Sequence, residues 1–223
     1  MSGAPADIQK RPDILDRMER MYRPQRLIYD LTRKYYLVGR DRLIAELVLR
    51  HRDVVIDIGC GTGRTLAAIA QRQPSARLYG LDAANVMLET TAERFAKAGL
   101  DAPGLARGTA ETLDPEALFG VPAADHIIFS YSLSMMDDPV LALHRAVASL
   151  APEGQLHIVD FGPMDGLPRP LAAAMRAWLA RFGVRHRPEL APTLRQLAQT
   201  TGGSTSRRRL AGGYAEILHY RRS

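Results

Sequence analysis

The sequence is poor in cysteine, in long apolar runs and in metal-ligating patterns. Cys60 is the only cysteine among 223 residues, so no disulfide can form within the chain and a reducing compartment is expected. No apolar run reaches the roughly 20 residues of a membrane-spanning helix, and residues 1–7 lack the apolar block of a signal peptide. The six histidines show no metal-ligand spacing. These absences argue against a disulfide scaffold, a transmembrane segment and a metal centre, and they predict a cytoplasmic protein.

Positive and negative charges are unevenly distributed along the chain. Residues 1–52 carry 12 Lys and Arg against 7 Asp and Glu, residues 53–175 carry 8 against 15, and residues 176–223 carry 10 against 2. An acidic middle flanked by two basic ends suggests an anionic partner, such as a phospholipid leaflet or a nucleic acid. For charge counts alone, an arginine-rich surface that only contacts solvent is the simpler alternative.

Strand-like and helix-like segments alternate from Asp53 onward, which predicts a mostly parallel sheet with helices on both faces. The order of these segments is typical of an α/β domain. Strands are expected at 54–58, 77–81, near 105, 126–130 and 155–161, helices at 64–73, 85–97, 139–150 and 171–182, and a closing hairpin at 205–210 and 214–220.

Residues 1–52 have a different pattern, typical of a helical cap in front of the domain formed by residues 53–223. Pro12 and Pro24 stand where prolines begin helices, and Gly39 is expected to end one. Apolar residues recur at helical spacing in three segments, which predicts about three short helices.

The stretch 54–64 carries the most specific pattern of the chain. A β-branched strand with Asp57 near its end is followed by glycine at positions 59, 61 and 63 and then by an alanine-rich helix. Such a turn lets a ligand lie against the backbone, where a Cβ would collide. The dinucleotide fingerprint places its third glycine one residue later, so this spacing differs from it, and a generic nucleotide loop is the remaining alternative. Asp57 is placed to reach a cationic group of the ligand.

Further polar residues follow the next strands of the expected sheet. Asp82 ends the second strand about twenty residues after the glycines, where a carboxylate can accept hydrogen bonds from both ribose hydroxyls of an adenosine. A helix N-cap is the alternative role of Asp82, compatible with the first. Ser130 and Tyr131 follow the fourth strand, at the edge where ligands of open α/β sheets bind.

Together these residues resemble the cofactor site of class I S-adenosylmethionine-dependent methyltransferases, over about residues 53–161. The resemblance implies a Rossmann-like seven-stranded sheet, mostly parallel with an antiparallel last strand, and S-adenosylmethionine as the methyl donor. The family usually has an acidic residue on the adenine amino group where this chain has Thr109, so the contact is left open among three neighbouring residues. The cofactor-binding residues implied are Asp57, Gly59, Gly61, Gly63, Asp82, Ala83, Met87, Thr109, Ala110, Glu111 and Ser130.

Two other enzyme classes lack their motifs in this chain. A short-chain dehydrogenase needs Tyr-x-x-x-Lys, and no tyrosine here is followed by lysine at that spacing. An amino-methylating DNA enzyme usually has Asn/Asp-Pro-Pro-Tyr/Phe after its fourth strand, where residues 130–133 read Ser-Tyr-Ser-Leu. A nucleic-acid partner is not expected.

The acceptor of the methyl group is suggested by residues 21–44. This segment and residues 130–135 resemble bacterial betaine-lipid synthesis methyltransferases, which convert diacylglyceryl-homoserine to diacylglyceryl-trimethylhomoserine. The broader kin are phosphatidylethanolamine N-methyltransferases, which form the second interpretation. An RNA or small-molecule methyltransferase and a non-catalytic lipid-binding protein are further alternatives.

Tyrosines recur every seven residues in this segment, each followed four residues later by an arginine on the same helical face. Arginine could hold a lipid carboxylate or phosphate and tyrosine a methylated ammonium, although ordinary packing is the alternative. The substrate-binding residues expected are Tyr22, Arg26, Tyr29, Arg33, Tyr36 and Arg40.

The lipid amine must lose its proton before it attacks the methyl group. Tyr29, Tyr131 and Asp160 are the candidate bases, a water relay is another route, and the sequence does not choose among them. Arginines 207–209 and the amphipathic segment 14–22 would attract an anionic leaflet, so peripheral association with the inner membrane is expected.

Overall fold

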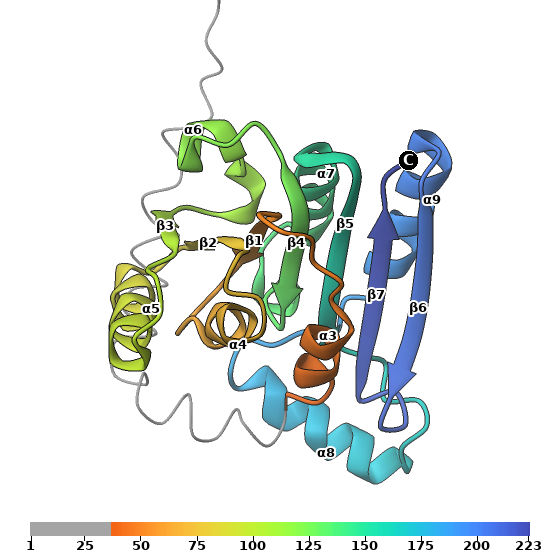
Figure 1. Cartoon of the computed structure of the whole chain (residues 1–223). Helices are drawn as coiled ribbons and strands as arrows, with labels where there is room; N and C mark the ends of the chain where they lie inside the picture. The colour runs from red at the N-terminus through yellow and green to blue at the C-terminus, as the bar shows by residue number, and fades with distance from the viewer. Residues whose placement is uncertain (1–36) are drawn as a thin grey trace, which may run out of the picture.

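The computed structural model describes residues 37–223, which form one seven-stranded sheet in the order β3-β2-β1-β4-β5-β7-β6 (Figure 1). Neighbouring strands from β3 to β5 are parallel, and β7 is antiparallel to both β5 and β6. The strands are β1 (Val54–Ile58), β2 (Arg77–Asp82), β3 (Gly104–Arg107), β4 (Ala124–Ser130), β5 (Leu150–Phe161), β6 (Ser204–Leu210) and β7 (Ala215–Arg221). The predicted fold class is confirmed.

Helices cover both faces of the sheet and bury two separate apolar clusters. One cluster joins the sheet to α7 and α9, which lie behind the sheet in Figure 1, and the other joins it to α3, α4, α5 and α8. The helices are α3 (Arg40–Glu46), α4 (Arg64–Arg72), α5 (Asn85–Ala98), α6 (Pro115–Phe119), α7 (Pro139–Ala148), α8 (Arg169–Ala180) and α9 (Leu190–Thr201), with 3-10 turns η2 (Ala110–Thr112) and η3 (Leu133–Met135).

Local sequence signals explain several helix starts. Asp138 and Asp114 cap α7 and α6, where their carboxylates accept hydrogen bonds from backbone N–H groups of the first turn, and a proline follows each. Gly39, which was expected to end a helix, instead caps the start of α3 with a φ of 94°. Leu43 and Ile44 of α3 are buried in the same cluster as Val55 and Ile217, so α3 packs directly on the body of the domain.

Two further differences from the predicted elements have simple physical causes. Strand β5 begins at Leu150, before the turn that was expected at 152–154. Glu153 has a φ of 61°, and the register with β4 shifts between Ala124 and His126, so the expected turn is an irregularity within the strand. Helix α9 was not predicted, and its Pro192 lies in the first turn of the helix, where proline is tolerated. Of the three helices expected before residue 52, only α3 falls within the described residues, and the other two lie outside them.

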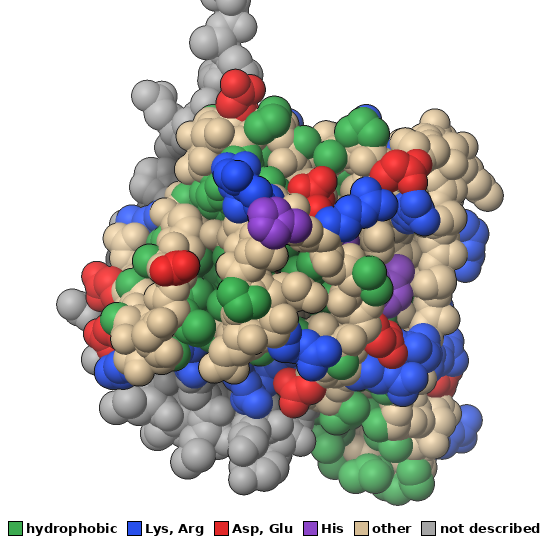
Figure 2. Space-filling model, in the orientation of Figure 1, with side chains coloured by type: hydrophobic (Ala, Val, Ile, Leu, Met, Phe, Trp, Pro, Cys, Tyr) green, Lys and Arg blue, Asp and Glu red, His purple; other side chains and the backbone are tan. Residues whose placement is uncertain are grey.

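Charged residues of both signs cover the β6–β7 hairpin and the elements beside it (Figure 2). Arg207 pairs with the buried Glu216 at 2.6 Å, Arg209 pairs with Asp165 at 2.5 Å, and Arg208 pairs with Glu46 of α3. The arginine run at 207–209 is therefore engaged in ion pairs within the chain.

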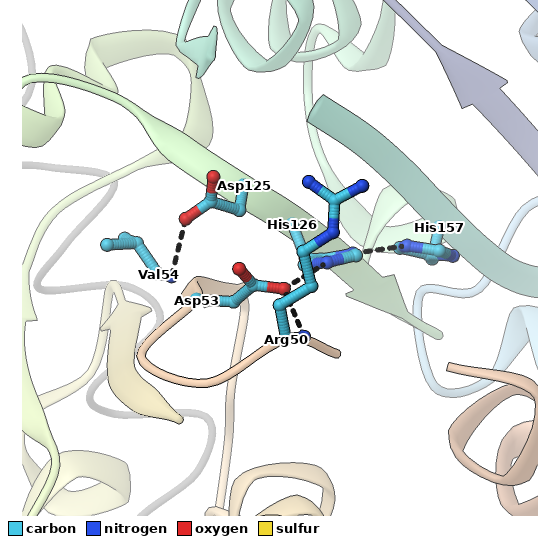
Figure 3. Close-up of polar contacts among 6 residues, drawn as sticks. All are labelled: Arg50, Asp53, Val54, Asp125, His126 and His157. Carbon is cyan, nitrogen blue, oxygen red and sulfur yellow. Dashed lines mark hydrogen bonds and ion pairs between the residues drawn. The ribbon is translucent and has the colours of Figure 1, made fainter. Parts of the chain in front are cut away.

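The amino-terminal edge of the sheet carries a buried hydrogen-bonded row of side chains. Asp53 contacts His126 at 3.2 Å, His126 contacts His157 at 3.0 Å, and His157 contacts His219 at 3.1 Å. Figure 3 shows the first three in line, with Asp125 nearby accepting a hydrogen bond from the Val54 N–H. The row joins four elements, from the start of β1 to β7, through side chains alone.

Candidate functional site

The glycine loop between β1 and α4 has the left-handed backbone that its sequence predicts. Gly59, Gly61 and Gly63 have φ angles of 70°, 55° and 71°. A Cβ on Gly59 would lie 2.5 Å from the Cβ of Ser132, so the loop packs tightly there, whereas a Cβ on Gly61 would meet no described atom within 4 Å. Gly61 therefore faces open space, where a ligand can approach the backbone.

Asp57 is a buried carboxylate without a hydrogen bond. Neither of its oxygens has a hydrogen-bond partner among the described residues. Burial and then the negative charge of Asp82 raise the pKa of Asp57 to about 7, while the Arg40 guanidinium acts in the opposite direction. Burying a neutral polar group without a hydrogen bond costs on the order of 2–7 kcal/mol, and burying an ionised carboxylate costs more. Its retention indicates a group that needs a donor from a ligand.

Asp82 holds the glycine loop in place. Its carboxylate accepts hydrogen bonds from the Gly61 N–H at 2.8 Å and from the Ala84 N–H at 3.0 Å. The N-cap of α5 is Ala84, so Asp82 stands two residues before the cap position that it was expected to fill. The carboxylate thus links the ends of β1 and β2, and ribose binding by Asp82 stays a prediction.

The remaining predicted cofactor residues line the same edge of the sheet. Ala83 and Met87 follow β2, Thr109 caps η2 after β3, and Ser130 ends β4, so these positions share the carboxyl edge of four neighbouring strands. Ala110 is buried and Glu111 is half-buried in the same turn. The Ser130 hydroxyl is buried and has no hydrogen-bond partner among the described residues. The structure therefore brings the predicted cofactor residues together, while their contacts with a cofactor stay predicted.

A small pocket lies beside the glycine loop. It has a volume of about 40 Å³, and Leu37, Arg40, Asp57 and Ser130 line it together with the glycine loop. Arg40 is buried and reaches the pocket from α3. Of the six residues expected to bind the acceptor, Arg40 alone falls within residues 37–223, and Tyr22, Arg26, Tyr29, Arg33 and Tyr36 lie outside them.

Tyr131 connects the end of β4 to the segment before α3. Its hydroxyl donates a hydrogen bond to the Val38 carbonyl, and its backbone has a φ of 58°. Burial raises the pKa of the Tyr131 hydroxyl far above its usual range. This environment disfavours a phenolate, so the hydroxyl is better suited to holding the 37–40 segment over the site than to accepting a proton.

Asp160, near the end of β5, is the second described candidate base. It is buried and accepts hydrogen bonds from the Ser134 N–H at 2.9 Å and the Phe161 N–H at 2.8 Å. Burial raises its pKa to about 6, although these backbone donors oppose the shift. Tyr131 and Tyr214 both contact the Phe161 ring edge-on, with centroids 4.7 and 5.7 Å from its own. The third candidate base, Tyr29, lies outside the described residues.

Sequence reasoning missed the segment 184–187, which crosses the ends of β4 and β5. The Arg185 N–H donates to the Ser134 carbonyl at 3.1 Å, Arg187 donates to the Met136 carbonyl, and His186 lies 3.2 Å from the Phe161 carbonyl. The side chains of His186 and Arg187 and the backbone of Arg185 thus contact residues beside the predicted site. Their charge run was visible in the sequence, but nothing there placed them at this edge.

No helix within residues 37–223 is long and apolar enough to cross a membrane. In the same range, no group of His, Cys, Asp and Glu side chains could hold a metal ion.

Comparisons with known proteins agree on the class of domain. Residues 56–156 match the family described as a methyltransferase domain. A trans-aconitate 2-methyltransferase of Methylobacterium radiotolerans is 34% identical over 147 residues, covering 63% of this chain and 52% of that protein. One from Escherichia coli O157:H7 is 30% identical over 151 residues, covering 67% and 55%. The chain spans about half the length of the curated relatives that it matches.

A solved structure confirms the fold. The mitomycin 7-O-methyltransferase MmcR superposes with a TM-score of 0.66 at 22% identity, over 84% of this chain and 54% of that one. The names of the relatives refer to trans-aconitate, so they do not support the lipid acceptor that residues 21–44 suggest.

Proposed function

We propose that this chain, which contains a methyltransferase domain of the class that uses S-adenosylmethionine, methylates the amine of a membrane lipid. The observation that carries methyl transfer is the buried, unbonded carboxylate of Asp57 beside the open backbone of Gly61. A cationic ligand lying on the glycine loop gives this carboxylate the partner that it lacks.

The residues present fit S-adenosylmethionine. Asp57 would bind its ammonium group, Asp82 would hold both the loop and the ribose, and the turn at 109–111 would contact the adenine. The bound cofactor supplies an electrophilic methyl group on a sulfonium. The chain contributes mainly by orienting the acceptor and keeping water away, which accounts for a large part of the acceleration when the methyl group is already reactive.

For the acceptor, we propose diacylglyceryl-homoserine, methylated repeatedly to the trimethylated betaine lipid, with phosphatidylethanolamine as the close alternative. Asp160 takes the proton of the amine, because its raised pKa makes it a stronger base than an ordinary carboxylate. The Tyr131, Phe161 and Tyr214 rings, which contact one another near the end of β5, suit a growing methylated ammonium. Arg40 suits the carboxylate of such a headgroup.

A small carboxylic acid is the second candidate acceptor. The named relatives favour it, since both are called trans-aconitate 2-methyltransferases. The basic segment 184–187 at the edge of the site suits an acidic acceptor as well.

The test supplies the purified protein with methyl-labelled S-adenosylmethionine and one acceptor at a time. The acceptors are vesicles containing diacylglyceryl-homoserine, vesicles containing phosphatidylethanolamine, and free trans-aconitate. Label in a lipid supports the proposal. Label in trans-aconitate alone would show that the chain is a methyltransferase whose acceptor is a small carboxylic acid and not a lipid. Calorimetric binding of the cofactor without label in any acceptor would overturn both acceptors, and failure to bind the cofactor would overturn the site.

A further inference from the structure

Helix α8 is unusual in this structure because few of its side chains are buried. Only Ala172 and Leu179 are buried among its twelve residues. Leu171, Trp178 and Phe182, in the helix and the turn after it, are 49%, 37% and 45% exposed. Their spacing of seven and four residues places them along one stripe of the helix surface, next to the buried one.

The stripe is apolar and aromatic, and the segment that carries it is purely basic. Trp178 and Phe182 contact each other edge to face at 5.1 Å. Between residues 166 and 188 there are five arginines and one histidine and no acidic residue. An aromatic and aliphatic stripe flanked by arginines is the pattern of a helix that lies in the headgroup region of an anionic bilayer.

The position of α8 links it to the proposed reaction. Figure 1 shows α8 along the lower side of the molecule, towards which the carboxyl ends of β4 and β5 point, and Figure 2 shows apolar side chains at that corner with basic ones above them. Arg176 donates a hydrogen bond to the Pro163 carbonyl just after β5, and the chain after α8 continues into the basic segment over the site. A bilayer under α8 therefore lies at the same edge as the site.

We propose that the exposed stripe of α8 docks the protein on an anionic phospholipid bilayer, so that a lipid headgroup can reach the site without leaving the membrane. The inference rests on the proposed lipid acceptor and names the surface that would deliver it. A second copy of the chain fits this face less well, because a symmetric contact would bring Arg169, Arg176 and Arg181 of both copies together, in a segment without an acidic residue.

The chain provides its own reporter, since Trp178 is its only tryptophan. The full chain is mixed with vesicles of phosphatidylglycerol and phosphatidylcholine, or of phosphatidylcholine alone, without any methylatable lipid. We expect a blue shift of Trp178 emission, and quenching by brominated acyl chains, with the anionic vesicles only. The shift should weaken as salt rises, because the arginine contribution is screened.

A matched pair of variants tests the stripe. Phe182→Gln should weaken anionic-vesicle binding roughly tenfold, because one aromatic ring no longer enters the interface. Val48→Gln, at an apolar position that is 80% exposed on another surface, should leave binding unchanged. Both variants should bind S-adenosylmethionine in solution as the unaltered protein does, which separates this inference from the proposed site.

Two results would overturn the inference. One is binding to anionic vesicles without any change in Trp178 emission, which would place the membrane contact elsewhere. The other is that iodide does not quench Trp178 emission in the free protein and vesicles do not change that emission, which would show that another part of this chain covers the stripe. Vesicle binding without lipid methylation would instead count against the proposed acceptor and leave the docking surface standing.

Discussion

Two aspartates, Asp53 just before β1 and Asp57 near its end, have opposite surroundings. Asp53, just before the strand, accepts hydrogen bonds from the Arg50 N–H and from His126, and it anchors a row of buried side chains. Asp57, four residues later, is buried, and neither of its oxygens has a hydrogen-bond partner within residues 37–223. The strand thus has a satisfied end and an unsatisfied end. Nearly all buried polar groups in proteins are hydrogen-bonded, so Asp57 is the residue for which a ligand is expected to supply the hydrogen-bond donor.

The largest expected effect comes from removing the unsatisfied charge. Asp57→Asn keeps the size of the side chain and should weaken S-adenosylmethionine binding about a hundredfold, near 2.7 kcal/mol, because a charged hydrogen bond to the ligand is lost. The same change should raise the free energy of unfolding without ligand by about 1 kcal/mol, since a buried charge disappears. Calorimetry and urea unfolding measure the two quantities. A variant that binds normally would remove Asp57 from the site.

A change in the histidine row that begins at Asp53 should lower stability and leave cofactor binding unchanged. His157→Leu leaves Nδ1 of His126 and Nδ1 of His219 without their hydrogen-bond partner and should lower the free energy of unfolding by about 2 kcal/mol, with cofactor affinity unchanged. His144→Leu, at an exposed position on α7, is the control and should change stability little. Equal stability of the two variants would show that the row contributes nothing.

The two ends should also respond to pH in opposite ways. Burial raises the pKa of Asp57 to about 7, so cofactor affinity should rise with pH and fall roughly tenfold per unit below that value, as the carboxylate becomes protonated. In the free protein, an Asp with a raised pKa favours folding most at low pH and loses that contribution as pH rises towards 7. Calorimetry between pH 5.5 and 8 gives the affinity profile, and a flat profile would contradict the role of Asp57.

The buried histidines should make folding stability depend on pH in the opposite direction. Burial lowers the pKa of His126, of His219 and, most strongly, of His157, whose neighbouring histidines add to the effect, so folding holds these rings neutral. Their contribution to stability is present above the ordinary pKa of 6.5 and is lost as pH falls below it. Urea unfolding from pH 7.5 to 5 should show this loss in the unaltered chain and a smaller one in His157→Leu. Identical profiles would rule out the row as its source.

The smallest effect is expected at Tyr131, which connects the end of β4 to the segment before α3. Tyr131→Phe removes the hydrogen bond to the Val38 carbonyl and should lower stability by about 1 kcal/mol. If the hydroxyl only holds the 37–40 segment, saturating cofactor and acceptor should restore most of the turnover. A complete loss of turnover with cofactor binding intact would make the hydroxyl a catalytic group instead.

The sequence predicted most of the fold because its signals are local. β1 was placed at its observed bounds, since a β-branched run ends in glycines with positive φ. The position of Asp82 and Ser130 at the carboxyl edge followed from the expected parallel order. The cofactor side of the site was predicted for the same reason. Each of its residues lies at the end of a strand or in the segment that follows it.

Contacts between segments that are distant in the sequence could not be predicted from such local signals. The row from Asp53 to His219 spans four elements, and the approach of segment 184–187 to the β4 end depends on how α8 packs. Arg40 was assigned to an acceptor face by a seven-residue spacing, whereas the structure places it beside Asp57, a contact that only the packing of α3 creates. The pattern identified residue types, and the tertiary structure determined their neighbours.

The hydrogen bonds in the row of histidines all run in one direction, towards Asp53. The Asp53 carboxylate can only accept, so His126 donates to it from Nε2 and must accept at Nδ1. His157 then donates from Nε2 and accepts at Nδ1, and His219 donates from Nδ1. One carboxylate therefore selects the tautomer of three successive rings and aligns their dipoles across the sheet. The last ring is left with a lone pair on Nε2, so the row can take up a proton at that end without breaking a bond.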